Sequence, residues 1–130
     1  MNSQSVADPR FLLDANVCIN VLEGRSAQAV ERMSQCAVGE LVTSAVAYAE
    51  VMIGAVRLGK MKKAQLFFDQ VPVLPFDLHA ANVYAQLPFK RGSYDRLIAA
   101  QALSLGMGLV TSNIGDFAHV PGLVVEDWTR

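Results

Sequence analysis

Short runs of consecutive apolar residues alternate along the chain with longer segments whose apolar residues recur at helical spacing. The short runs predict strands, because a strand that is covered on both faces needs no polar side. These runs lie at 11–13, 41–43, 73–74, 109–111 and 124–125. The longer segments, which predict helices, lie at 16–22, 26–36, 45–58, 60–70, 78–87 and 94–105. This alternation predicts an α/β fold, with a mainly parallel sheet and helices on both of its faces.

Turn and capping residues support these element boundaries. Gly24 and Gly106 each follow the end of a predicted helix, where a residue that tolerates left-handed backbone angles is common. Asp77 precedes an alanine-rich helix and predicts its N-cap. Because no repeat, linker or low-complexity tract interrupts the pattern, we expect one domain over residues 1–130, in which 1–9 form a loosely ordered N-terminal extension.

Composition and charge exclude several classes of protein. Of the 130 residues, 52% are hydrophobic and 18% are charged, which favours a folded domain over a disordered chain. The formal net charge of −1 lacks the basic excess of proteins that coat duplex nucleic acid. No apolar stretch reaches the roughly 20 residues of a membrane span, and the first residues lack the pattern of a secretory signal. We therefore expect a soluble, cytoplasmic protein.

Four acidic residues stand out from the total of 12 by their surroundings. Asp14 follows the first predicted strand, and Asp116 follows the strand that ends at Thr111. Asp95 opens an apolar helix, and Glu50 lies inside another. In an open parallel sheet the ligand crevice lies beyond the carboxyl ends of the strands, so these carboxylates could converge there. Carboxylates removed from water need hydrogen bonds, a cationic partner or a metal ion.

Each of these acids also has a simpler interpretation on its own. The alternatives are a helix cap at Asp14, a helix cap or an Arg96 partner for Asp95, an Arg57 partner for Glu50, and an ordinary turn residue at Asp116. The four together favour a metal site, because a divalent cation relieves the repulsion among clustered carboxylates. Oxygen ligands without cysteine or histidine favour Mg²⁺ or Mn²⁺ over zinc. Such a site suits metal-assisted attack of water on a phosphodiester bond.

Five segments carry a more specific pattern. They are Leu12-Leu13-Asp14-Ala15-Asn16, Ser44 to Val51 with Gly54, Tyr94 to Ala102, Leu109 to Asn113 continuing to Phe117, and Val120 to Trp128. In this order, over nearly the whole chain, they resemble the PIN-domain ribonucleases, and specifically the VapC-type toxins of type II toxin–antitoxin systems. The resemblance implies a three-layer α/β/α fold, a Mg²⁺- or Mn²⁺-dependent endoribonuclease activity, an RNA substrate and inhibition by a VapB-type antitoxin.

The resemblance also implies roles for individual residues. The catalytic positions fall on Asp14, Glu50, Asp95 and Asp116, with the metal on Asp14 and Asp95, and the supporting polar positions on Asn16, Thr111 and Asn113. Many relatives carry an aspartate at the place of Asn113, so the fourth acidic role lies between Asn113 and Asp116. Because loss of an outer carboxylate weakens a second metal more than the first, we expect one bound ion in the resting enzyme.

Two other classes of protein remain as alternatives. A receiver-like phosphoacceptor domain also has a Mg²⁺-binding acidic crevice and a strand that ends in hydroxyl residues, here Thr111-Ser112. That fold would have an acidic pair near its first strand, whereas Asp14 is single, and a lysine after its last strand, whereas no lysine follows Met107. A catalytically idle interaction domain would not need the acids together. Metal-dependent cleavage of RNA separates the three.

Contacts to RNA and to partner proteins must come from other residues, because an acidic crevice repels phosphate. Candidate RNA contacts beside Asp95 are Lys90, Arg91 and Arg96, and a second basic cluster comprises Arg57, Lys60, Lys62 and Lys63. Candidate surfaces for the antitoxin or for a homodimer involve Val17, Ile19, Val21, Leu22, Val30 and Met33, with core packing as the alternative.

Overall fold

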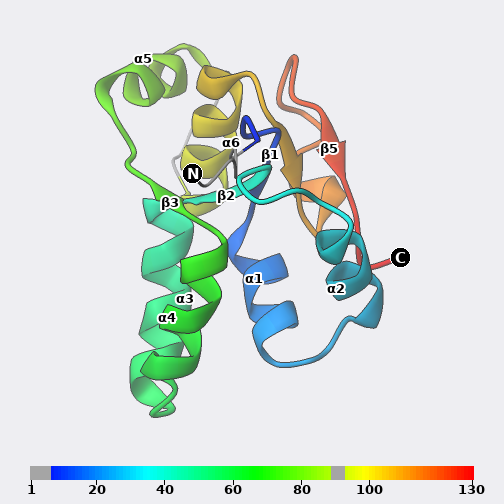
Figure 1. Cartoon of the computed structure of the whole chain (residues 1–130). Coiled ribbons are helices and arrows are strands. Elements are labelled where there is room, and N and C mark those ends of the chain that lie inside the picture. The colour runs from blue at the N-terminus through cyan, green and yellow to red at the C-terminus, as the bar shows by residue number, and fades with distance from the viewer. Residues whose placement is uncertain (1–6, 89–92) are drawn as a thin grey trace, which may run out of the picture.

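The computed structural model describes residues 7–88 and 93–130 (Figure 1). Over these ranges the strands and helices follow one another in the order that the sequence predicts. Two of the candidate RNA contacts, Lys90 and Arg91, lie outside the described residues. Within the described ranges, no helix has the length and apolar character needed to cross a bilayer.

A five-stranded sheet, in the order β3-β2-β1-β4-β5, forms the centre of the fold, and every pair of neighbouring strands is parallel. The strands are β1 (Phe11–Leu13), β2 (Leu41–Ser44), β3 (Val73–Leu74), β4 (Gly108–Val110) and β5 (Val125–Glu126). Leu13 of β1 lies opposite Thr43 of β2 on one side and Val110 of β4 on the other. The chain runs outward from β1 to β3 and then crosses back to β4. The junction of β1 and β4 is therefore the switch point, where open parallel sheets bind ligands.

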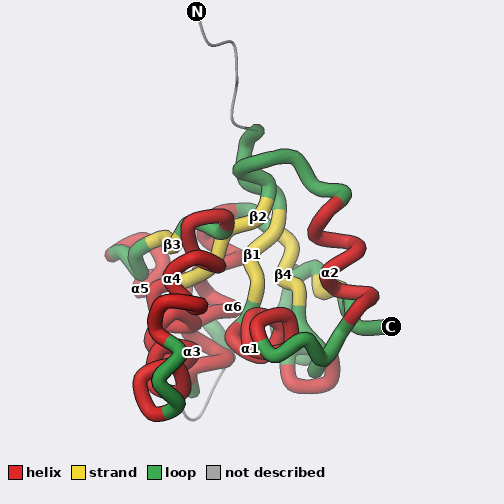
Figure 2. The backbone as a smooth tube through the Cα atoms, turned by 60° about the horizontal axis from the view of Figure 1, so that its bottom comes forward, coloured by secondary structure: helices red, strands yellow, loops and turns green. Residues whose placement is uncertain are grey.

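Helices connect the strands and cover the sheet. They are α1 (Ala15–Leu22), α2 (Ala27–Ser34), α3 (Ala45–Arg57), α4 (Met61–Gln70), α5 (Leu78–Gln86) and α6 (Tyr94–Leu105), with a short 3₁₀ helix, η1 (Ile114–Asp116), between β4 and β5. Contacts join α1 to α2, α3 and α4, whereas α5 packs on α6. Because parallel crossovers are right-handed, the reversal of direction after β3 puts α5 and α6 on the opposite face of the sheet from α1. Figure 2 shows the strands between these groups of helices. The predicted α/β fold with helices on both faces is confirmed.

Side-chain caps begin the helices that matter most for the crevice. Asp14 caps α1, Ser44 caps α3 and Ser93 caps α6, each through a hydrogen bond from a backbone N–H group of the first turn. The predicted cap at Asp77 is confirmed, since its Oδ1 accepts a 2.9 Å hydrogen bond from the backbone of Ala80. Since Ser93 takes the capping role in α6, the simpler interpretation of Asp95 as the cap is wrong.

The two central strands form the most deeply buried part of the molecule. Leu12 and Leu13 of β1 and Leu109 and Val110 of β4 have no exposed surface. This burial holds the carboxyl ends of the two strands in a fixed place. The predicted strand at 109–111 is shifted by one residue, so Thr111 is the first residue beyond β4 and not the last within it.

Candidate active site

The switch point brings Asp14 and Thr111 together, one residue beyond the ends of β1 and β4. The backbone N–H of Asp14 donates a 3.0 Å hydrogen bond to the carbonyl oxygen of Val110, which continues the pairing of the two strands. The Thr111 hydroxyl donates a hydrogen bond to Oδ2 of Asp14, and both side chains are buried. Residues far apart in the sequence therefore meet because their strands are neighbours.

Asp14 combines a capping role with an environment that resists its charge. Its Oδ1 accepts a 2.9 Å hydrogen bond from the backbone N–H of Val17, and only 1% of the surface of the residue is exposed. Burial raises the pKa of Asp14 to about 6, although the hydrogen bonds from Thr111 and Val17 act in the opposite direction. The interpretation of Asp14 as a helix cap is thus correct but incomplete, because a cap alone does not require such burial.

Glu50 and Asp95 lie near Asp14 on two helices that contact each other, α3 and α6. The pKa of Glu50 is raised by burial first and then by the negative charges of Asp95 and Asp14. Glu50 Oε1 is buried and has no hydrogen-bond partner within the described ranges. The described residues contain no ion pair between Glu50 and Arg57, which leaves the alternative pairing without support. The negative charges of Asp95 and Asp14 thus oppose ionisation of Glu50.

Asp116 stands at the rim of this group. It ends η1, is exposed, and raises the pKa of Asp95 through its negative charge, after the larger effect of the burial of Asp95. The exposed Asn113 precedes η1, and its backbone N–H donates a 3.0 Å hydrogen bond to Oγ1 of Thr111. Both residues between which the sequence leaves the fourth acidic role therefore lie near the crevice, Asp116 through its charge and Asn113 through its hydrogen bond to Thr111.

The remaining candidates lie around these acids. Asn16 is exposed in the first turn of α1, and a hydrogen bond from its backbone helps to lower the pKa of Asp14. Arg96 follows Asp95 in α6 and is half-buried. We name the group formed by Asp14, Glu50, Asp95 and Asp116, with the buried Thr111 at its base and the exposed Asn113 at its rim, the carboxylate crevice.

The donor set of the carboxylate crevice fits a hard divalent cation. Within the described ranges Glu50 Oε1 is a buried acceptor without a donor, and burial, followed by neighbouring negative charges, raises the pKa values of Asp14 and Asp95. Within residues 7–88 and 93–130, no group of three or more acidic, histidine or cysteine side chains is placed so that it could hold a metal ion. A Mg²⁺ site needs fewer protein ligands, because this ion is commonly held by one or two carboxylates and keeps several of its waters.

The carboxylate crevice continues into a cleft that the sequence does not predict. The cleft has a volume of about 710 Å³, and its lining includes Asn113 and Asp116 on one side and Arg32, Glu126 and Trp128 on the other. Arg32 lies 94 positions from Glu126, and no local pattern links the two residues. Sequence reasoning missed this cleft because only the folded sheet brings α2 beside β5.

The apolar residues predicted as a partner surface separate into three environments. Val17 is fully buried in the core. Ile19 and Leu22 line a groove between α1, α3 and α4, together with the exposed Leu58. Val21, Val30 and Met33 line a second groove between α2 and α4. Core packing therefore accounts for Val17, whereas the other residues lie at two separate grooves.

Comparisons of the sequence and of the structure with known proteins point to the same family. The family model for the PIN domain matches residues 11–123. The tRNA(fMet)-specific endonuclease VapC of Shigella flexneri is 31% identical over 132 aligned residues, which cover 92% of this chain and 98% of that protein. Ribonuclease VapC1 of Haemophilus influenzae, strain R2866, is also 31% identical, with the same coverage. Among solved structures, DNA-bound VapBC from Salmonella typhimurium aligns with a TM-score of 0.82 and 28% identity, over 92% of this chain and 98% of that one.

Proposed function

The chain belongs to the PIN-domain family and is a VapC-type ribonuclease toxin, and we propose that its carboxylate crevice holds Mg²⁺ or Mn²⁺ and hydrolyses RNA phosphodiester bonds there. Membership of this family sets aside a phosphoacceptor domain and an idle interaction domain. One observation carries the assignment of the site. Glu50 Oε1 is buried without a hydrogen-bond donor in the described part of the chain, and Asp95 and Asp14 lie close enough to raise the pKa of Glu50, so a cation among these carboxylates would relieve their repulsion.

Asp14 and Asp95 are the proposed metal ligands. Asp14 is held on both of its oxygens, by the Thr111 hydroxyl and by the backbone N–H of Val17, so its carboxylate cannot turn away from the crevice. Such hydrogen bonds to a ligand commonly set its orientation and its affinity for the metal. When bound, the ion stabilises charge on the phosphate and lowers the pKa of a coordinated water.

Glu50 is the proposed general base. Its Oε1 accepts the proton of the attacking water, the water oxygen bonds to phosphorus, and the bond from phosphorus to the leaving ribose oxygen breaks. That oxygen takes a proton from solvent water, and Glu50 then returns its proton to solvent. A raised pKa suits this role, because a base works best when its pKa approaches the pH of the reaction. Asp116 and Asn113 at the rim would position the attacking water or the RNA backbone.

Cleavage of total RNA by the purified, antitoxin-free protein tests the proposed function. We expect cleavage with Mg²⁺ or Mn²⁺, none with a chelator, and a loss of at least about 100-fold for Asp14→Asn and Asp95→Asn. Asp69→Asn is the matched control, because Asp69 is an exposed acid on α4 outside the crevice. Equal cleavage by the crevice variants and the control, or none by folded wild-type protein, would contradict the proposal.

The RNA substrate is proposed from the relatives. The Shigella flexneri and Salmonella typhimurium proteins are both named tRNA(fMet)-specific endonucleases. Initiator tRNA is therefore the first substrate to test, with an elongator methionine tRNA as the control. Discrete fragments from the initiator tRNA alone would support the same specificity, whereas equal cleavage of both RNAs would exclude it.

The proposed protein partner is a VapB-type antitoxin, since several matching structures are toxin–antitoxin complexes. Its proposed docking site is the groove between α1, α3 and α4, where Ile19, Leu22 and Leu58 offer apolar contacts beside Lys60 and Lys63. Leu58→Asp should weaken the complex with a VapB-type antitoxin and leave RNA cleavage intact. The control is Leu78→Asp, at an exposed leucine that starts α5.

A homodimer is proposed from the apolar surface beside the crevice. Ile53 and Tyr94 are 49% and 57% exposed and line a hollow that also includes Leu97 and Glu50. A second copy of the chain would cover these side chains. Sedimentation or light scattering should give a dimer mass for wild-type protein and a monomer mass for Ile53→Asp, and a monomer mass for both would exclude this interface.

A further inference from the structure

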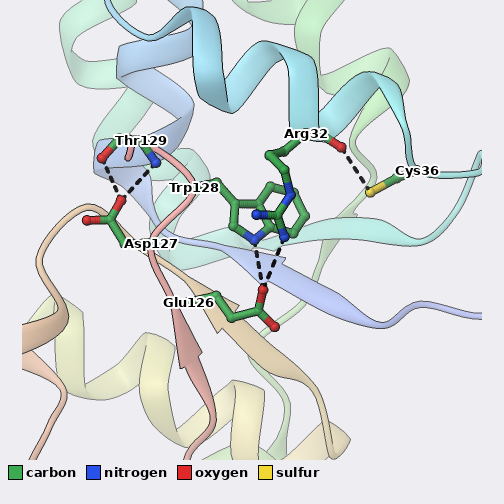
Figure 3. A network of polar contacts seen from close by, with 6 residues as sticks. All are labelled: Arg32, Cys36, Glu126, Asp127, Trp128 and Thr129. Atoms are coloured by element: carbon green, nitrogen blue, oxygen red, sulfur yellow. Dashed lines mark hydrogen bonds and ion pairs between the residues drawn. The ribbon is translucent and has the colours of Figure 1, made fainter.

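The cleft beside the carboxylate crevice holds an arginine in a fixed arrangement. The guanidinium carbon of Arg32 lies 4.8 Å from the centre of the Trp128 ring. An Arg32 nitrogen lies 3.4 Å from Oε1 of Glu126, and the Trp128 indole N–H donates a 2.9 Å hydrogen bond to the same oxygen. Figure 3 shows the guanidinium across the face of the indole, with both groups directed to Glu126. Stacking and an ion pair together restrict an otherwise flexible side chain.

Arg32 keeps the capacity to bind another group. A guanidinium has five N–H donors, and within the described residues one hydrogen bond, to Glu126, is assigned to it. Its side chain is 48% exposed on the cleft side of α2. The charge is therefore both oriented and accessible.

We infer that this cleft binds the sugar–phosphate backbone of the RNA next to the bond that is cut, and that Arg32 contacts a phosphate there. The inference rests on the proposed ribonuclease function. Asn113 and Asp116 line both the cleft and the rim of the carboxylate crevice, so a strand that enters one continues into the other. Arginine is well suited to this contact because its planar donors match the geometry of a phosphate.

The lining of the cleft favours a nucleic acid over a protein segment. Most of its residues are polar or charged, including Ser112, Asn113 and Arg130, whereas the groove at Ile19 and Leu22 offers the apolar contacts that a peptide helix needs. Two of the three acids that line the cleft are paired, Glu126 with Arg32 and Asp127 with Arg130 at 3.3 Å, and the third, Asp116, belongs to the carboxylate crevice. Exposed ion pairs contribute little, so a phosphate can replace an acid as the partner of an arginine at low cost.

A purely structural role for the same three residues makes a different prediction. If Arg32 served only to fasten α2 to the end of the chain, loss of either Arg32 or Glu126 would destabilise the fold in the same direction. If Arg32 binds phosphate, the two losses act on RNA in opposite directions, because Glu126 competes with the phosphate for Arg32. The sign of the Glu126 effect therefore distinguishes the two roles.

RNA affinity measured against salt concentration tests the inference. Glu50→Gln provides a background that keeps both proposed metal ligands, and fluorescence anisotropy of a labelled single-stranded RNA in Mg²⁺ gives the Kd. We expect Arg32→Gln to raise the Kd about five-fold and to reduce the slope of log Kd against log salt by about 0.7, which corresponds to one phosphate contact. Arg32→Lys, which keeps the charge, should restore most of the slope, whereas Glu126→Gln should lower the Kd unless Arg32 is also replaced.

Arg10→Gln is the matched control, since Arg10 also pairs with a glutamate, Glu40, at 3.0 Å and lies 5.1 Å over an aromatic ring, that of Phe11. Arg10 precedes β1, at the opposite end of the sheet, so its replacement should leave the Kd and the slope unchanged.

An unchanged Kd for Arg32→Gln, or a weaker affinity for Glu126→Gln, would overturn the inference. So would an Arg32→Gln effect on antitoxin binding alone. If Arg32→Gln does not fold, Glu126→Gln decides, because a glutamine keeps an acceptor for Trp128. Failure of wild-type protein to cleave RNA would instead contradict the proposed function.

Discussion

Carboxylates at the two ends of the central sheet have pKa values that are shifted in opposite directions. At the amino end, just before β2, Glu40 accepts a 2.6 Å hydrogen bond from the backbone N–H of Ala37 and pairs with Arg10, and both contacts lower its pKa. At the carboxyl end, just after β1, Asp14 is buried near Asp95 and its pKa rises to about 6. The fold thus favours the ionised form of Glu40 and opposes that of Asp14. A carboxylate that costs stability is expected where a metal ion, rather than the protein, completes its environment.

The largest expected difference between the two ends of the sheet is in the rate of RNA cleavage, when Glu50 at the carboxyl end or Glu40 at the amino end is replaced. We expect Glu50→Gln to slow RNA cleavage by about 10²- to 10⁴-fold, the usual contribution of a general base. Glu40→Gln should leave the rate unchanged, because Glu40 lies at the other end of the sheet. Single-turnover rates with the same RNA compare the two variants. A similar loss in both would show that the effect comes from folding and not from the crevice.

Removal of the Thr111 hydroxyl should weaken the crevice without removing a carboxylate. In Thr111→Val, Oδ2 of Asp14 loses its hydrogen-bond donor, which raises the pKa of Asp14 further. Because partners of metal ligands commonly contribute 10- to 100-fold, we expect the affinity for Mn²⁺ and the rate of cleavage to fall by about 10-fold. Thr111→Ser, which keeps a hydroxyl, should recover most of the loss. Equal losses in both variants would contradict a role for the hydroxyl.

The stability of the metal-free protein should depend on pH through Asp14. The pKa of Asp14 rises from 3.8 to about 6 on folding, so the stabilisation by its protonated form is complete below about pH 4 and is lost as the pH rises through 6. Asn is as good a helix cap as Asp, and Asp14→Asn removes the charge. We therefore expect Asp14→Asn to equal wild type in urea unfolding near pH 4 and to exceed it by about 1–3 kcal/mol at pH 7.5. A lower stability of Asp14→Asn than of wild type at pH 7.5 would contradict the claim that the charge of Asp14 destabilises the metal-free fold.

The amino end should show the smallest effect, with the opposite sign. Since the pKa of Glu40 is lowered on folding, its ionisation stabilises the fold above its ordinary pKa, and this contribution is lost as the pH falls below it. Glu40→Gln should therefore slightly lower the melting temperature at pH 7.5 and have less effect under acidic conditions. Both melting curves are measured without metal. A higher melting temperature for Glu40→Gln than for wild type at pH 7.5 would contradict the claim that ionised Glu40, unlike ionised Asp14, stabilises the fold.

Much of the fold follows from the sequence because its signals are local. Apolar runs predict all the strands to within one residue, and Asp77 and Gly106 mark helix ends that the structure confirms. Once the strands are parallel, residues that follow them must lie at one end of the sheet. For that reason the sequence could already suggest that Asp14 and Asp116 converge, and Asp95 joins them because it lies in the first turn of the helix that leads back to β4.

Other features depend on contacts that no local pattern records. The buried, unpartnered Oε1 of Glu50 results from the packing of α3 against α6. The pairing of Arg32 with Glu126 and Trp128 requires α2 to lie beside β5, and a charge on an exposed helix face gives no indication of it. The roles of Lys90 and Arg91 stay predictions from the sequence.

Calorimetric titration of Mn²⁺ into the purified protein at pH 7.5 tests the central claim most directly, since that claim is that the carboxylate crevice holds a divalent ion. We expect about one ion per chain for wild type and for Glu40→Gln, and no measurable binding for folded Asp14→Asn or Asp95→Asn. Equal binding by wild type and the two crevice variants, or no binding by folded wild type, would contradict it.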